Sequence, residues 1–320
     1  MAFLDRFARD EWNIGIVHQT IEDIARHGIE QPVHWFPADS WRIFADPFCV
    51  VQPDGGVTIM AELLNHWVGK GEIWTASVHA GDDPLKAKFH RHITGPVHLS
   101  YPSCIQDGAV TYATMESYEA GGLFLWRRNG DEWHFERTLL TGPVVDATIY
   151  RHGQFWWLFC TFGDDRPDER LHLFYSRSLA EEWRPHPANP IKDDRAGARP
   201  AGALFQVDGK LIRPSQNSSK TYGGSLVLNH VVALTPEAFQ EVSYRHILPE
   251  SQYYADGIHT IAAAGSYTVI DGKRWHYGSA NLVRALVAKA VKMHRKRKAR
   301  KFRPQEIALA IPSIPSIQAT

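Results

Sequence analysis

The sequence has few cysteines and no long apolar run. Its three cysteines, Cys49, Cys104 and Cys160, are far apart and have no metal-ligand spacing, so we interpret them as small buried residues. No stretch approaches the roughly 20 consecutive apolar residues of a membrane span. The first ten residues lack the apolar core of a signal peptide. These absences argue against a disulfide framework and predict a cytoplasmic protein.

The sequence also lacks the motifs of several enzyme classes. No GxGxxG opens a helix, and there is no Walker loop and no GxSxG, which argues against the common nucleotide-binding and serine-hydrolase sites. The 17 histidines include no HExxH, and His90 and His92 share a strand face without a third ligand nearby. We therefore expect neither a cofactor nor a metal ion.

The net charge is zero, but the charges are unevenly distributed. Ten of the 35 basic side chains lie between Asn281 and Arg303, and only one of the 35 acidic ones, Glu306, lies after residue 280. The chain up to residue 280 therefore contains 25 basic and 34 acidic side chains, a net charge of about −9. An acidic body and a basic tail can each attract a different partner.

The sequence does contain a repeat of about 50 residues. In each repeat a short apolar run leads into a polar anchor residue, and a turn and a second strand-like run follow. The anchors are Asp46, Tyr101, Asp146, Arg199 and His259, with steps of 55, 45, 53 and 60 residues between them. This period, with several β-rich runs in each repeat, is typical of propeller blades. The anchors would then occupy equivalent places on five sheets and converge on one axial pocket.

Each repeat contains the turns and strands that a blade requires. Turns with Asp and Gly, which predict hairpins between apolar runs, occur at Asp54-Gly55-Gly56, Asp107-Gly108 and Asp208-Gly209. Four units have four strand-like runs each, and a shorter fifth unit extends from 257 to 277. The early run from Trp12 to Val17 would supply the missing strand and close the ring. We therefore predict an all-β fold, a five-bladed β-propeller over residues 1–278.

After the fifth unit the hydrophobic pattern takes a helical period. Leu282, Leu286 and Val287 lie near one stripe, next to a block of basic residues. This pattern predicts a C-terminal amphipathic basic helix over residues 279–303, and the remaining residues 304–320 are predicted to form an extended tail.

Three interpretations of the basic helix stay open. It could be a solvated charged helix, or residues 281–303 could dock on an anionic membrane surface. Nucleic-acid binding is disfavoured, because Phe302 is the only aromatic residue there that could stack on a base. The sequence gives no indication of the oligomeric state.

The anchor segments resemble a known family. The runs FADPF, VHLSYPS, VVDATIY, ARPAGALF and DGIHTI look like the propeller domain at the N-terminus of plant glucosamine inositolphosphorylceramide transferases, which also has stand-alone bacterial relatives. The resemblance extends from Trp12 to Trp275 and does not include the basic tail. The family belongs to the five-bladed superfamily of family 43 glycoside hydrolases, so the resemblance implies a carbohydrate-active propeller.

The same resemblance implies catalytic roles for two anchors, and it implies that a third anchor stands in place of the proton donor. It places Asp46 where family 43 hydrolases have a general base, and Asp146 where they have a carboxylate that tunes the general acid. Those hydrolases have a glutamic acid as the proton donor on the fourth blade, where this chain has Arg199. Because an arginine stays protonated near neutral pH, Arg199 cannot be the acid. Either another carboxyl group donates the proton or hydrolysis has been lost.

Two further acids, Glu62 and Glu116, end the second strands of the first two units, and equivalent strand ends lie on one face of a propeller. Glycosidic cleavage needs two carboxyl groups in different protonation states, and clustered acids shift one another's pKa values apart. We predict Asp46 as base or nucleophile, Glu116 as acid and Asp146 as the residue that tunes it. The predicted substrate-binding residues are Glu62, Tyr101, Arg199, Arg213, Gln216 and His259.

Several functions stay open at this point. The first is an enzyme that makes or breaks a glycosidic bond in a cell-envelope glycan or sugar-lipid intermediate, located in the cytoplasm or peripherally at the inner face of the membrane. The second is a non-catalytic sugar-binding or scaffold module beside a glycosyltransferase, which Arg199 in the acid position favours. In a third, purely structural interpretation, Arg199 and Arg213 pair with Asp46 and Asp146 and fix the hub.

Overall fold

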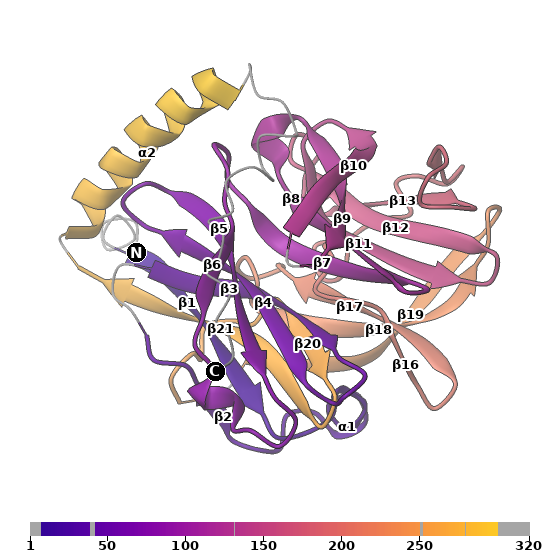
Figure 1. The fold of residues 1–320 in the computed structure, drawn as a ribbon, viewed down its shortest axis with the longest axis horizontal. Coiled ribbons are helices and arrows are strands. Elements are labelled where there is room, and N and C mark those ends of the chain that lie inside the picture. The colour runs from indigo at the N-terminus through magenta and orange to yellow at the C-terminus, as the bar shows by residue number, and fades with distance from the viewer. Residues whose placement is uncertain (1–7, 39–41, 131, 250–251, 279, 300–320) are drawn as a thin grey trace, which may run out of the picture.

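The strands form five sheets arranged around a common centre (Figure 1). The computed structural model describes residues 8–38, 42–130, 132–249, 252–278 and 280–299. Within each sheet the paired strands run antiparallel. Each sheet is one blade, so the predicted five-bladed β-propeller is confirmed.

The first four blades follow the order of the chain. Blade 1 contains β3 (Arg42–Val51), β4 (Val57–Asn65), β5 (Lys70–Val78) and β6 (His90–Ile93). Blade 2 contains β7 (Ser100–Asp107), β8 (Val110–Glu116), β9 (Gly122–Asn129) and β10 (Glu132–Thr141). Blade 3 contains β11 (Val144–His152), β12 (Phe155–Phe162), β13 (Arg170–Ser176), β14 (Arg184–Pro185) and β15 (Lys192–Asp193). Blade 4 contains β16 (Phe205–Val207), β17 (Lys210–Asn217), β18 (Ser225–Leu234) and β19 (Phe239–Ile247).

Blade 5 joins strands from both ends of the described chain. Its order is β20 (Ile261–Ala264), β21 (Tyr267–Tyr277), β1 (Ala8–Val17) and β2 (Val33–Trp35). Strands β1 and β21 pair over their full common length, from Ala8 opposite Tyr277 to Val17 opposite Thr268. The early run that includes Trp12 therefore closes the ring, as the sequence predicts.

Apolar side chains fill the space between the blades because each strand alternates its side chains between two faces. Trp156 and Trp157 are neighbours on β12, and both are buried, but they pack in different clusters. Trp156 contacts a cluster with blade 2 residues such as Leu125, whereas Trp157 lies in a cluster with Leu211 of blade 4. Each blade is thus held by apolar packing against both neighbours.

The helices are few and lie outside the sheets. Helix α1 (Ile21–His27) connects β1 and β2, and two single turns, η2 (Pro84–Lys86) and η3 (Tyr118–Ala120), lie in loops. Helix α2 (Ala280–Ala299) falls within the predicted basic helix. The predicted extended tail, 304–320, lies outside the described residues. Among the described helices, none combines the length and the apolar content of a membrane span.

Candidate functional site

Three anchors share an unusual backbone conformation. The innermost strands β3, β7 and β11 each have a register shift at the anchor, and Asp46, Tyr101 and Asp146 have φ values of 52°, 47° and 49°. A bulge with a non-glycine residue in the left-handed region costs on the order of 1–3 kcal/mol and is concentrated at functional sites. The repetition of this strain on three blades supports a function for the hub, since it re-aims three side chains at equivalent places.

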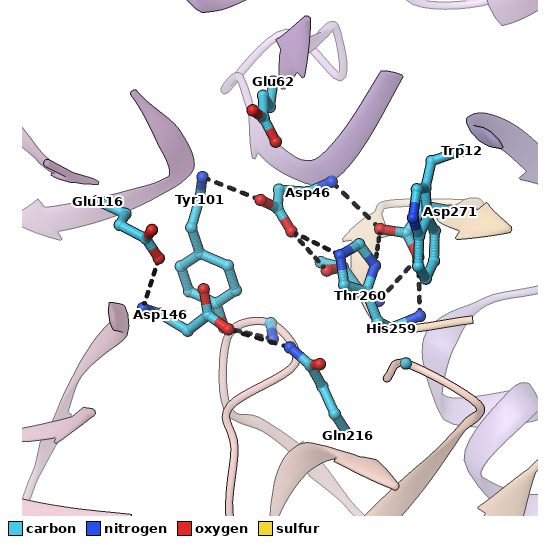
Figure 2. Close-up of polar contacts among 12 residues, drawn as sticks. Trp12, Asp46, Glu62, Tyr101, Glu116, Asp146, Gln216, His259, Thr260 and Asp271 are labelled. Atoms are coloured by element: carbon cyan, nitrogen blue, oxygen red, sulfur yellow. Dashed lines mark hydrogen bonds and ion pairs between the residues drawn. The ribbon is translucent and has the colours of Figure 1, made fainter. Parts of the chain in front are cut away.

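Asp46 is buried between blades 1, 2 and 5 (Figure 2). Its carboxylate accepts hydrogen bonds from the backbone N–H of Tyr101 at 3.3 Å and from the hydroxyl of Thr260 at 3.2 Å. The Nε2 atom of His259 lies 3.4 Å from Oδ1 of Asp46. Burial raises the pKa of Asp46 from 3.8 to about 6, although the nearby His259 opposes this shift. Asp46 therefore changes its charge close to neutral pH.

Asp271 on β21 holds this part of the hub together. Its carboxylate accepts the backbone N–H groups of Asp46 at 3.2 Å, and of His259 and Thr260 at 2.9 Å. It also lies 2.5 Å from Nδ1 of His259, but this contact lacks the direction of a hydrogen bond and is mainly electrostatic. Burial favours the neutral imidazole, but the contact with Asp271 and the charges of Asp46 and Asp146 together outweigh this and raise the pKa of His259. The ring of Trp12 packs on His259 with centroids 4.0 Å apart.

Asp46, His259 and Asp271 place ligand atoms within 4.8 Å of one another, which is close enough for a metal ion. An imidazole that carries protons on both nitrogens is a donor and not a ligand. The raised pKa of His259 therefore favours a proton at this place, and the absence of a metal stays a prediction.

Asp146 occupies the corresponding position on blade 3 but has different partners. Its Oδ2 atom accepts from Nε of Arg199 at 2.5 Å and from the amide of Gln216 at 3.0 Å. Arg199 also binds Asp168 at 2.9 Å and lies over the ring of Tyr222. Burial disfavours the charged guanidinium, but Asp146 outweighs burial and raises the pKa of Arg199 further. Arg199 is thus a fixed cation and cannot donate a proton.

Glu116 ends β8, as the sequence predicts, whereas β4 continues for three residues beyond Glu62 to Asn65. Glu116 accepts the backbone N–H of Asp146 at 3.2 Å, and burial followed by repulsion from Asp146 raises its pKa well above the ordinary value. Burial also raises the pKa of Glu62 well above its ordinary value, and Asp46 adds to this shift. Both shifts favour the protonated form of these glutamic acids.

The surroundings of Glu62 are built by a histidine and a glycine. Oε1 of Glu62 lies 3.4 Å from Nε2 of His98, and Nδ1 of His98 accepts the backbone N–H of Gly71 at 3.0 Å. Burial lowers the pKa of His98 to about 4, so this imidazole is neutral near neutral pH. A Cβ atom at Gly71 would lie 2.1 Å from Oε1 of Glu62 and 2.5 Å from the backbone carbonyl of Leu99, and the backbone contact requires glycine at this position.

Tyr101 connects the two aspartate groups. Its ring lies between Asp46 and Asp146 in Figure 2. Its hydroxyl accepts the backbone N–H of Gly202 at 2.7 Å and lies 2.9 Å from the hydroxyl of Thr148. Since both polar ends of Tyr101 already have protein partners, its main role in this state is to join blades 1, 2, 3 and 4.

Arg213 is not brought to this group of acids. It is buried and pairs with Glu241 of β19 at 2.7 Å, and it also donates to the carbonyls of Gly197 and Ala198. The interpretation of Arg213 as a partner of Asp46 or Asp146 is therefore wrong, whereas the pairing of Arg199 with Asp146 is confirmed. The structure brings the other predicted residues together at the hub, which we call the hub cluster: Asp46, Glu62, Tyr101, Glu116, Asp146, Arg199, Gln216 and His259.

The family model described as "Glucosamine inositolphosphorylceramide transferase 1, N-terminal" matches residues 36–259, which include every member of the hub cluster. The chain belongs to this family. The resemblance found in the anchor segments is thereby confirmed.

A member of this family is similar to part of this chain in sequence, and more distant proteins are similar to it in structure. Glucosamine inositolphosphorylceramide transferase 1 of Arabidopsis thaliana is 31% identical over 222 residues, which are 66% of this chain and 28% of that protein. This chain therefore spans little more than a quarter of that relative's length.

The catalytic domain of a family 62 α-L-arabinofuranosidase from Coprinopsis cinerea has a TM-score of 0.53 and 11% identity, covering 74% of this chain and 93% of that one. A thermostable family 43 glycoside hydrolase has a TM-score of 0.50 and 10% identity, covering 66% and 78%. At this identity the two structures show that the fold is shared.

Sequence reasoning about this family member missed Trp12, Thr260 and Asp271. A signal for Asp271 was present, because it follows the second-strand run of the fifth unit as Glu62 and Glu116 end those of the first two. Moreover, Asp271 accepts the backbone N–H of the anchor in blade 1 as Glu116 accepts that of the anchor in blade 3. Trp12 has no such signal, since it comes from the strand that closes the ring.

Proposed function

We propose that this protein makes or breaks a glycosidic bond with the carboxyl groups of the hub cluster. The observation that supports this most is that buried acids from neighbouring blades meet at the hub with raised pKa values. Glycosidic cleavage needs one carboxylate and one carboxylic acid beside the same bond. Asp46, with a pKa of about 6, supplies the carboxylate, and Glu116, whose pKa is raised well above that of an ordinary glutamic acid, supplies the proton.

The proposed steps assign one task to each acid. Glu116 gives its proton to the leaving oxygen as the bond between that oxygen and the anomeric carbon breaks. Asp46 takes a proton from water or from the hydroxyl of an acceptor sugar, whose oxygen forms the new bond to the anomeric carbon. Asp146 pairs with Arg199 and orients Glu116 through its backbone N–H. Tyr101, Gln216 and His259 hold the acids in place.

The proposed substrate is a cell-envelope glycan or a sugar-lipid intermediate. The name of the Arabidopsis relative, a glucosamine inositolphosphorylceramide transferase, favours a lipid-linked sugar. In this proposal the protein acts in the cytoplasm, peripherally at the inner face of the membrane. Glu62 and Arg199 contact the sugar or its anionic group, because these polar groups stand beside the proposed acids.

The test is turnover of a panel of oligosaccharides and sugar-lipids by the Asp46→Asn and Glu116→Gln variants, with products measured by mass spectrometry. Each change removes a proton transfer and is expected to lower kcat by about 10²–10⁴-fold, with ligand binding retained. Asp82→Asn, a change at an exposed turn position, serves as the matched control and is expected to leave turnover unchanged. Unchanged turnover by Asp46→Asn would reject the proposed mechanism.

A non-catalytic sugar-binding module is the second candidate. The observation that favours it is Arg199, which takes the place of the proton donor and occupies Asp146 with an ion pair at 2.5 Å. Calorimetric titration with the same panel separates the two functions. Binding that depends on Arg199, without product after days of incubation with the unmodified protein, would favour the binding module over the enzyme.

A further inference from the structure

Helix α2 contacts the propeller through its polar side. Arg295 is buried and donates to Glu119 at 2.7 and 3.0 Å and to the carbonyls of Val68 and Gly69 at 3.0 and 2.8 Å. About one turn from the start of the helix, Arg284 lies over the ring of Trp67 at 5.3 Å. These two arginines lie on one face of the helix because their spacing of 11 residues is close to three turns.

The apolar side of α2 faces solvent instead. Val283, Leu286, Val287 and Met293 are 57%, 62%, 39% and 56% exposed. Leu286 and Val287 follow Val283 by three and four residues, and Met293 follows Leu286 by seven, close to two turns, so the four form one stripe on the face opposite Arg295. A surface helix of a globular protein normally turns its apolar stripe towards the core. Since α2 does the reverse, its contacts with the propeller leave an apolar surface that requires another partner.

The charge of α2 selects the chemistry of that partner. The helix contains seven basic residues and no acidic residue. Lys289 is exposed beside the apolar stripe, whereas Lys292 lies over the ring of Tyr118 at 5.6 Å on the propeller side of the helix. Like charges disfavour a second copy of the same helix, and nucleic acid would leave the apolar stripe without a partner. An anionic bilayer satisfies both features, since it offers phosphate groups to Lys289 and to the positive charge of the helix, and acyl chains to the apolar residues.

We propose that the outward face of α2 binds an anionic lipid bilayer, with Val283, Leu286, Val287 and Met293 in the interface. In Figure 1 the helix lies outside the sheets, so a flat surface can approach it. Tyr277, three residues before the helix, is also exposed, and tyrosine is favoured at membrane–water interfaces.

The position of α2 connects this surface to the hub cluster. Arg295 binds Val68 and Gly69 in the loop after β4 and Glu119 in the turn after β8, and these strands carry Glu62 and Glu116 close to those loops, Glu62 three residues from the end of β4 and Glu116 at the end of β8. The bilayer would therefore lie at the end of the propeller that carries the proposed acids. This step rests on the proposed function, and it favours a substrate that stays anchored in the membrane by a lipid.

The test is flotation of the full chain with vesicles of phosphatidylcholine alone or with about 30% phosphatidylglycerol. We expect binding to the anionic vesicles only, weakened about tenfold or more by about 1 M salt, which screens the lysines. Changing Leu286 and Val287 together to Ser should weaken binding about tenfold, because both side chains leave the interface. Lys289→Glu should weaken it by about fivefold or more.

The matched control changes two apolar residues that are equally exposed on blade 4. Val232 and Val242 are 52% and 47% exposed, and their joint change to Ser should leave vesicle binding unaltered. Absence of binding by the unmodified chain, or equal binding by the Leu286/Val287 variant, would overturn the proposal. A dimer in size-exclusion chromatography that the same variant abolishes would identify a second copy as the occupant instead. Turnover of a soluble oligosaccharide does not depend on α2, so a failure here is distinguishable from a failure of the proposed chemistry.

Discussion

The hub cluster has two halves, one around Asp46 and one around Asp146, whose aspartates share a backbone conformation but have different partners. Asp46 and Asp146 both lie in a bulge and have a positive φ, and each has a partner that can carry a positive charge. The partner of Asp46 is His259, a group that titrates, whereas the partner of Asp146 is Arg199, which stays charged. The halves therefore differ in what they can do: the Asp46 half can exchange protons near neutral pH, and the Asp146 half is a permanent ion pair. This division favours Asp46 as the residue that changes protonation during a reaction.

The largest expected effect comes from breaking the permanent pair. Changing Arg199 to Ala leaves the buried Asp146 carboxylate with Gln216 as its remaining side-chain partner, and the removal of one member of a buried pair costs about 3–5 kcal/mol. The free energy of unfolding in urea measures this loss. The corresponding change His259→Gln should cost less at pH 5, because Asp46 can then take up a proton.

Arg195→Ala is the matched control for Arg199→Ala. Arg195 lies four residues earlier and is half exposed, and its ion pair with Glu169 is long, at 3.7 Å. Its loss should change the free energy of unfolding by less than about 1 kcal/mol. If Arg199→Ala costs no more than Arg195→Ala, the Asp146 half is not held by its ion pair.

The second prediction concerns the pH dependence of stability in the Asp46 half. Because the pKa of Asp46 is raised to about 6, its contribution to stability is present below its ordinary pKa of 3.8 and is lost as the pH rises through about 6. Relative to Asp46→Asn, the unmodified protein should lose about 2–3 kcal/mol between pH 4 and 7. The raised pKa of His259 also makes the protein less stable as the pH rises, but only above its ordinary pKa of 6.5. Asp271 raises this pKa in both the unmodified protein and Asp46→Asn.

Urea unfolding of both proteins at several pH values measures this difference. If the free energy of unfolding depends on pH in the same way for the unmodified protein and for Asp46→Asn, Asp46 is ionised throughout. The two halves would then not differ in the proposed way.

The sequence was sufficient to predict the fold because each blade carries its own local signals. The Asp-Gly turns define the hairpins, and equivalent positions of blades must converge, so Asp46, Asp146 and Arg199 could be placed together. The prediction that Arg213 lies at the hub was wrong, and the spacing of residues along the strand already argues against it. Residues three apart on a strand point to opposite faces, so Gln216 at the hub implies that Arg213 points away from it. The protonation of Glu62 and Glu116 could not be predicted, since it depends on burial that only the packed blades create.

The smallest expected effect tests the connection between the two halves. In Tyr101→Phe the backbone N–H of Gly202 loses its acceptor, which costs about 1–2 kcal/mol when the group is buried. The backbone N–H of residue 101 still donates to Asp46, so the pH dependence assigned to Asp46 should stay unchanged. Urea unfolding at pH 5 and pH 7 measures both quantities. An equal loss of unfolding free energy at the two pH values means that Tyr101 holds the halves together but does not affect the titration of Asp46. A loss confined to one pH would show that Tyr101 couples the titration of the two halves.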